Sequence, residues 1–395
     1  MTVVLALVVV VVVAYLLISA YSDQVRHSQQ FAWGLFCYHV LFAVVYYLYA
    51  LAKPSDSKAY YRIGSNGVPR HLFGADPESV GWIDFYGFGT TFIDFLVYPF
   101  VYLLGFSYEA AMLLFSVFGF VGFFFFYLLL AERTVYRHKF FGIDVVVLIF
   151  FFPIAHFYSA SLGKGSVILA GMGMLFYGLN NMRERLPVLL IGALIVLHIR
   201  PHVMGALMAS AVVGAIISNK GLKLWQKVAI VGISAFGAVP LLEVAFGSAG
   251  IESLDVEEVL SAADKRATDH LSANSAVDIQ NYSQPMILFT FLFRPLFVDS
   301  PNAMGLIVSC ENLLYLILFI KIISLRFVKY FVQSPWMVKT SFIAFIVISL
   351  ALAQFSSNLG LATRQKTQVT YLFFIVLLSY ADYSYRQERK VVIGE

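Results

Sequence analysis

Two short motifs place basic and titratable side chains at the ends of hydrophobic runs. FYSASLGKGS holds Lys164 in a turn rich in serine and glycine, and LHIRPHV holds Arg200 beside His202. Small residues let the backbone approach a ligand, and the planar arginine side chain can bind a phosphate through two parallel hydrogen bonds. A histidine can move a proton near neutral pH. The motifs predict an anion site with a proton-transfer group, although Lys164 could instead extend to lipid phosphates.

Two further motifs lie in the C-terminal part of the chain. TFLFRPLF contains Arg294 and precedes Glu311, which lies within an apolar run, while NLGLATRQK supplies Asn358, Arg364 and Lys366. An ionisable side chain at membrane depth costs about 2.5–3.5 kcal/mol on insertion scales, so it usually marks a function. We expect Glu311 to need a buried partner, and Arg294 is the candidate. The alternative is that this pair only fixes the register of two helices.

A carboxylate follows the second hydrophobic run, in the segment PSDSKAYYRIG. Asp56 stands a few residues after the run over residues 31–52, where it could act as a general base or hold a metal ion. The alternative is that Asp56 is only the N-cap of a surface helix. Asp76 and Asp84 are weaker candidates for the base. No metal site is predicted, and Cys37 and Cys310 both lie in apolar stretches.

Composition decides the class of fold that must position these residues. The 395 residues are 60% hydrophobic and 13% charged, whereas a soluble domain is about one quarter charged. We therefore predict an all-α, polytopic transmembrane bundle of roughly 10–12 spans, organised as one domain over residues 1–395. The first run is long enough to be a retained helix and not a cleaved signal. The hydrophobic runs cover residues 2–20, 31–52, 108–131, 141–160, 165–179, 186–199, 203–218, 225–246, 303–323, 336–353 and 371–380.

The distribution of lysine and arginine predicts how the bundle is oriented. Basic residues gather in alternate short loops, for example around Arg133, Arg183 and Lys220, which makes those loops and the C-terminus cytoplasmic. The segments around Lys164, Arg200, Arg294 and Arg364 would then face outward. We expect residues 53–107 and 247–302 to be outer loops. Within them, residues 88–106 would lie along the interface and residues 286–297 would form a re-entrant segment.

These placements define a candidate ligand. Five basic residues on one face would make a cationic outward cavity for an anionic lipid headgroup, phosphate or pyrophosphate: Lys164, Arg200, Arg294, Arg364 and Lys366. The sequence contains no Walker loop, dinucleotide-binding glycine motif, HExxH or GxSxG. Nucleotide-driven transport and the common hydrolases therefore lack support, and the driving energy must come from the substrate or from an ion gradient.

The segments FYSASLGKGS, IRPH, LFRPLF with the later Glu311, and NLGLATRQK resemble bacterial exopolysaccharide and O-antigen polymerase-like membrane proteins, which are similar to GT-C glycosyltransferases. The resemblance implies that Asp56 is the acid of the first outer loop and that Arg200 clamps the pyrophosphate. The sequence departs from the pattern at Gly165, where an acidic residue is expected. This puts the role of Lys164 in doubt.

The predicted function is polymerisation of polyprenyl-pyrophosphate-linked oligosaccharide units at the periplasmic face of a bacterial inner membrane. Candidate catalytic residues are Asp56, His202 and Glu311, and candidate pyrophosphate ligands are Lys164, Arg200, Arg294, Asn358, Arg364 and Lys366. No cofactor is predicted and a divalent metal is left open. The expected partners are the polyprenyl-linked glycan, membrane lipid and other polysaccharide-assembly proteins. The alternatives are a single-sugar GT-C transferase, a flippase or transporter of a lipid-linked glycan, and a non-catalytic scaffold.

Overall fold

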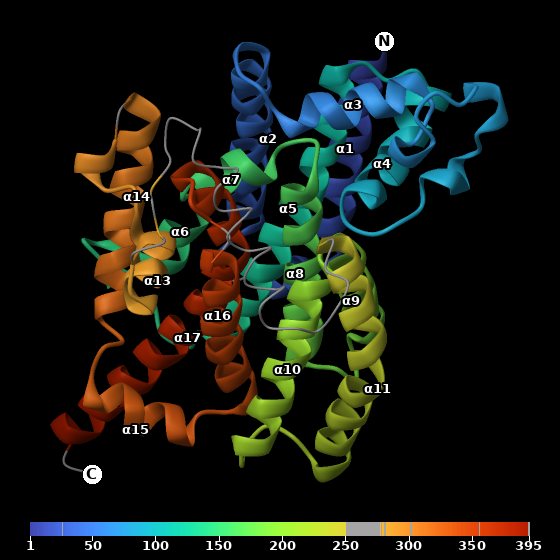
Figure 1. Ribbon diagram of the computed structural model, residues 1–395. Coiled ribbons are helices and arrows are strands. Elements are labelled where there is room, and N and C mark those ends of the chain that lie inside the picture. The colour runs from blue at the N-terminus through green and yellow to red at the C-terminus, as the bar shows by residue number, and fades with distance from the viewer. Residues whose placement is uncertain are drawn as a thin grey trace. The chain divides into compact units, whose positions relative to one another are not determined.

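The computed structural model is almost entirely helical, and it describes residues 1–25, 27–249, 277, 279, 282–300, 302–354 and 356–393 (Figure 1). The chain forms two compact units. Unit 1 comprises residues 1–132 and 146–201, and unit 2 comprises residues 133–145 and 202–395. Most of the predicted outer loop over residues 247–302 lies outside the described residues.

Among the described residues, five helices are long and apolar enough to cross a membrane: α1 (Thr2–Ala20), α2 (Gln29–Ala52), α5 (Tyr108–Arg133), α14 (Ala303–Ile320) and α16 (Trp336–Gln354). The prediction of a helical membrane protein is therefore confirmed. Other predicted spans correspond to shorter apolar helices, including α9 (Leu186–Ile199) and α10 (Pro201–Ile217). A helix needs roughly 20 apolar residues to cross the hydrocarbon core without help from its neighbours.

Helix α1 shows how apolar helices divide their surface between protein and lipid. Ala6, Val10, Ala14 and Ile18, spaced four residues apart, are its buried residues. Most of its other valines and leucines are exposed. A helix that is hydrophobic on every side requires an apolar solvent around its exposed faces, which is what a bilayer supplies.

The centre of unit 1 is α5, which packs against α8 (Lys164–Asn180), and α8 in turn packs against α9. A β-carbon on Gly173 would lie 2.4 Å from the carbonyl oxygen of Gly122, and one on Gly192 would lie 2.4 Å from the backbone nitrogen of Leu175. Small residues at these points let the backbones approach closely, as is common between membrane helices. This packing fixes the position of Lys164, the first residue of α8.

The loop region, residues 53–107, folds onto unit 1 through α3 (Asp56–Asn66), three short 3-10 turns (Arg70–Leu72, Pro77–Ser79 and Trp82–Phe85) and α4 (Thr90–Tyr98), which continues into a π turn over Pro99–Leu103. Together α4 and this turn are about 21 Å long at 1.5 Å per residue, which is shorter than the bilayer core. That length suits the predicted interfacial placement of residues 88–106. The placement itself stays a prediction.

Unit 2 contains α10, α11 (Leu224–Ala249), α13 (Gln284–Phe293), α14, α15 (Leu325–Gln333), α16 and α17 (Leu359–Ile393). Helix α13 ends where the sequence predicted a break, at Arg294 and Pro295. In contrast, α17 is much longer than the predicted run over residues 371–380. NLGLATRQK, which lies outside the predicted hydrophobic runs, therefore leads into and forms the start of this helix.

A small β-hairpin in unit 2 was not predicted. Strands β1 (Lys139–Phe140) and β2 (Ile143–Asp144) pair across Phe141 and Gly142, both with positive φ, as a tight hairpin turn requires. Asp382 of α17 accepts hydrogen bonds from the backbone nitrogens of Val135 and Tyr136, preceding the hairpin, and contacts His138 Nε2 at 2.6 Å. No local sequence pattern predicts this anchor, because its partners are more than 240 positions apart in the chain.

The helices α6 (Val145–Phe150) and α7 (Pro153–Ser159) connect this hairpin to α8. Pro153 starts α7, where its missing N–H would be unpaired in any case. Helix α7 packs against α2 within unit 1. The FYSASLGKGS motif therefore spans the end of α7 and the start of α8.

Candidate functional site

The most deeply buried acid of the loop region is Asp94 on α4, with 1% of its surface exposed. Arg70 donates to both carboxylate oxygens, from Nε at 2.7 Å and from Nη2 at 3.2 Å. The Arg70 side chain is 35% exposed and also lies over the ring of Tyr60. Burial raises the pKa of Asp94, while the charges of Arg70 and Lys164 oppose that rise. The ion pair therefore joins the 3-10 turn that holds Arg70 to α4 within the loop region.

Lys164 lies within electrostatic reach of that pair. Its side chain is half-buried, and its ammonium nitrogen would be 3.6 Å from a β-carbon built on Gly89. Gly89 has a φ of 69°, a conformation that favours glycine, so both its backbone and its lack of a side chain suit this position. The sequence-predicted lysine therefore meets the loop region, from which it is separated by more than 70 positions in the chain.

The LHIRPHV motif reaches the same neighbourhood. The backbone nitrogen of Gly89 donates to the carbonyl oxygen of His198 at 2.6 Å, and the Tyr86 hydroxyl lies 2.7 Å from His198 Nε2. The ring of His198 stacks on Phe88 with 5.2 Å between centroids. Three separate sequence segments therefore converge in unit 1, around Gly89, Lys164 and His198.

Asp56 starts α3, but it is not the N-cap. That role belongs to Ser55, whose hydroxyl accepts from the backbone nitrogen of Ser57. Asp56 is exposed, and its negative charge acts on Arg70. The capping alternative is therefore wrong, and Asp56 lies within electrostatic reach of Arg70.

Arg200 and His202 are neighbours in sequence but belong to different units. Arg200 follows the last residue of α9, its backbone nitrogen donates to Val196, and its side chain is half-buried in unit 1. His202 is exposed in the first turn of α10, in unit 2. Pro201 separates them as the first residue of the new helix, in agreement with the predicted break.

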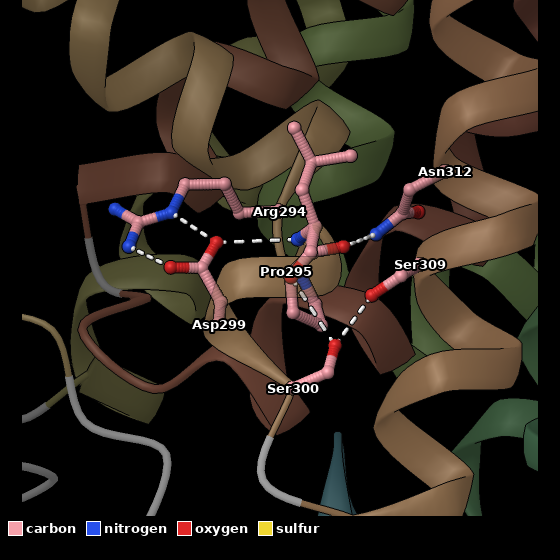
Figure 2. Close-up of polar contacts among 7 residues, drawn as sticks. Arg294, Pro295, Asp299, Ser300, Ser309 and Asn312 are labelled. Carbon is pink, nitrogen blue, oxygen red and sulfur yellow. Dashed lines mark hydrogen bonds and ion pairs between the residues drawn. The ribbon is translucent and has the colours of Figure 1, made fainter.

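In unit 2, the predicted pairing of Arg294 with Glu311 is wrong. Arg294 follows α13 and donates to both oxygens of Asp299, at 2.8 and 2.6 Å (Figure 2). The hydrogen bond from Arg294 lowers the pKa of Asp299. Arg294 pairs with Asp299 because the two residues are only five positions apart and the 3-10 turn at Phe297–Asp299 brings the carboxylate back toward Arg294. Arg294 is therefore already neutralised.

Lys366 is buried, with 4% of its surface exposed. Its ammonium donates to the Leu292 carbonyl at 3.1 Å and to the side-chain oxygen of Asn312. Asn312 in turn donates to the Pro295 carbonyl at 2.9 Å, as Figure 2 shows. The charge of Glu311 also acts on Lys366. Lys366 thus connects α13, α14 and α17.

The remaining predicted residues have more ordinary surroundings. Asn358 accepts hydrogen bonds from the backbone nitrogens of Gly360 and Leu361, so it caps the start of α17. Arg364 is half-buried in the first turns of the same helix. The predicted ligands Arg294, Asn358, Arg364 and Lys366 therefore all belong to unit 2, whereas Lys164 and Arg200 belong to unit 1.

Replacing Lys366 with methionine tests its connecting role. The variant leaves the Leu292 carbonyl and the Asn312 side chain without their donor, so we expect the free energy of unfolding to fall by about 1–3 kcal/mol. Chemical denaturation in detergent measures this change. The matched control is Lys329→Met on exposed α15, with an expected change within about 0.5 kcal/mol. Equal stability of the two variants would refute the connecting role of Lys366.

Sequence reasoning missed Arg70, Asn312 and the role of Asp94 as a buried partner. The one available signal was Asp94 itself, a charge inside an apolar stretch. Within the described ranges, no group of three histidine, cysteine, aspartate or glutamate residues could hold a metal ion. No protein-family model matches the chain, and neither does any curated protein or solved structure.

Proposed function

We propose that this membrane protein is a glycosyltransferase that joins polyprenyl-pyrophosphate-linked oligosaccharide units at the periplasmic face of a bacterial inner membrane. The observation that carries the proposal is the convergence in unit 1. The FYSASLGKGS motif and the LHIRPHV motif both meet the loop region at Gly89, beside the Arg70 and Asp94 pair. This arrangement gathers cations and a carboxylate at the end of apolar helices, where a lipid-linked pyrophosphate would lie.

The reaction forms one bond and breaks one. The acceptor hydroxyl oxygen bonds to the anomeric carbon of the donor sugar, while the bond from that carbon to the pyrophosphate oxygen breaks. The pyrophosphate leaves with the bonding electron pair, and a base takes the hydroxyl proton. Lys164 and Arg200 would stabilise the developing negative charge, commonly the largest catalytic contribution in such sites. Asp56 is the proposed base in unit 1, because it is exposed and its charge acts on Arg70 in the loop region.

Unit 2 offers a weaker version of the same chemistry. Arg294 is engaged by Asp299, and Lys366 by Asn312 and a backbone carbonyl, so both would have to exchange partners before binding pyrophosphate. We therefore assign the leaving-group site to Lys164 and Arg200. Glu311 and His202 are the candidate proton-transfer groups within unit 2.

The test is a reconstitution of the protein in lipid with a polyprenyl-pyrophosphate oligosaccharide. We expect release of polyprenyl pyrophosphate together with a ladder of lengthened glycans, and both should be lost in Arg200→Ala. The control is Arg62→Ala, an exposed arginine of α3. Addition of one sugar from a polyprenyl monophosphate donor would indicate the single-sugar transferase. Binding without turnover, abolished by Arg200→Ala, would indicate a flippase.

A further inference from the structure

Two histidines that the proposed reaction does not use face each other inside unit 1. His39 of α2 and His156 of α7 are both fully buried, and their Nδ1 atoms are 2.9 Å apart. His39 Nε2 lies 3.0 Å from the Ser116 carbonyl of α5, and His156 Nε2 lies 2.8 Å from the Phe150 carbonyl of α6. Every ring nitrogen of the pair therefore has one polar partner.

The three contacts of the two histidine rings require more protons than two neutral imidazoles carry. A carbonyl oxygen only accepts, so each Nε2 must carry a proton to make its hydrogen bond. Two bare Nδ1 atoms at 2.9 Å would direct their lone pairs at each other, so this contact also needs one proton. The three contacts require three protons, whereas two neutral imidazoles carry only two.

We infer that His39 and His156 form a proton-binding site, in which three protons on four ring nitrogens give the pair a single positive charge. Two imidazoliums would instead place two protons between the Nδ1 atoms, where the distance leaves room for one. The ligand of this site is a proton. Its binding is a property of the pair and not of either histidine alone.

The groups around the two histidines both oppose and favour a single positive charge on the pair. Burial among apolar groups opposes any charge. Phe123 of α5 stacks on the His156 ring with centroids 4.0 Å apart, and an aromatic face attracts a cation. Tyr38 of α2 is the titratable side chain in ring contact with His156, and its hydroxyl donates to the Phe151 carbonyl. Across the described residues, neither imidazole forms an ion pair with a carboxylate.

One glycine of α5 makes the close approach of His39 possible. A β-carbon on Gly119 would lie 2.6 Å from His39 Nε2 and 2.2 Å from the Ser159 carbonyl oxygen. Any larger residue would therefore displace the ring from the Ser116 carbonyl. Through the pair, α2, α5, α6 and α7 share hydrogen bonds that depend on the third proton. Its loss would break one contact or turn it into a repulsion.

The test is solid-state NMR of the full chain in lipid bilayers, with ¹⁵N in the histidine rings, at about pH 7. We expect magnetisation transfer between two Nδ1 atoms, which their separation of 2.9 Å permits, and within that pair three protonated nitrogens and one bare nitrogen. The His39→Asn variant should remove the transfer. The control His71→Asn, in an exposed turn of the loop region, should leave it unchanged.

Two outcomes would overturn the proton site. One is a pair with two protonated and two bare nitrogens, which is the neutral state. The other is a wild-type spectrum without transfer between Nδ1 atoms. The wild-type spectrum alone decides between these states, so the test stands even where His39→Asn fails to fold. Because it reads protonation directly, its result is independent of whether the chain transfers sugars.

Discussion

Replacing Lys164 with methionine is expected to slow glycan lengthening by about 100- to 1,000-fold, the loss typical when one group that stabilises a developing oxyanion is removed. Methionine keeps most of the length of the side chain and removes the ammonium group with its charge and its hydrogen-bond donors. Under the proposed mechanism, Lys164 acts on the leaving pyrophosphate, so the loss should appear in the rate at saturating substrate. The measurement is the rate of polyprenyl pyrophosphate release by reconstituted protein.

The matched control for this prediction is Lys58→Met. Lys58 is an exposed lysine of α3 in the same loop region, and its ammonium donates to the backbone carbonyls of Leu51 and Lys53. We expect this control to keep wild-type turnover. A Lys164→Met protein that lengthens glycan as fast as the control would remove Lys164 from the proposed mechanism.

Replacing Arg70 with methionine should have the largest effect on stability. The variant leaves the Asp94 carboxylate buried without its guanidinium. Breaking a fully buried ion pair in this way costs about 3–5 kcal/mol, and this is an upper bound here because the Arg70 side chain is 35% exposed. Thermal unfolding of the protein in detergent measures the loss. Restoring neutrality with Arg70→Met and Asp94→Asn together should recover most of it, because the double variant no longer buries a lone charge. A double variant as unstable as Arg70→Met would contradict the pairing argument.

We also expect the free energy of unfolding of Arg70→Met to depend on pH. Burial raises the pKa of Asp94 in the folded protein, and removing Arg70 takes away a charge that opposes this rise. The folded state then binds more protons than the unfolded state between the ordinary aspartate pKa of about 4 and the raised value, so stability should fall as pH rises through that window. Arg70→Met should therefore be more stable at about pH 5 than at about pH 7. The double variant should lack this slope.

The sequence by itself determined the class of fold. A chain that is 60% hydrophobic and only 13% charged has its apolar runs spread along its length, and in lipid such runs must satisfy their backbone groups internally, which favours helices. The break at Arg294 and Pro295 could also be predicted, because proline cannot continue a helix. The same local reasoning identified Lys164 at a glycine-rich turn. Hydropathy predicted only residues 371–380 of α17, because the first residues of this long helix are polar.

Tertiary structure alone decided which charges and rings meet. Arg294 pairs with Asp299 and not with Glu311, Asp94 takes Arg70 as its partner, and His39 meets His156 across 117 positions of chain. Hydropathy and spacing predict which segments and helix faces avoid water, because apolar residues recur along the chain in those segments. The partner of a buried polar group depends on which helices pack together. Close glycine contacts such as that between Gly122 and Gly173 set that packing, and they have no signature in local composition.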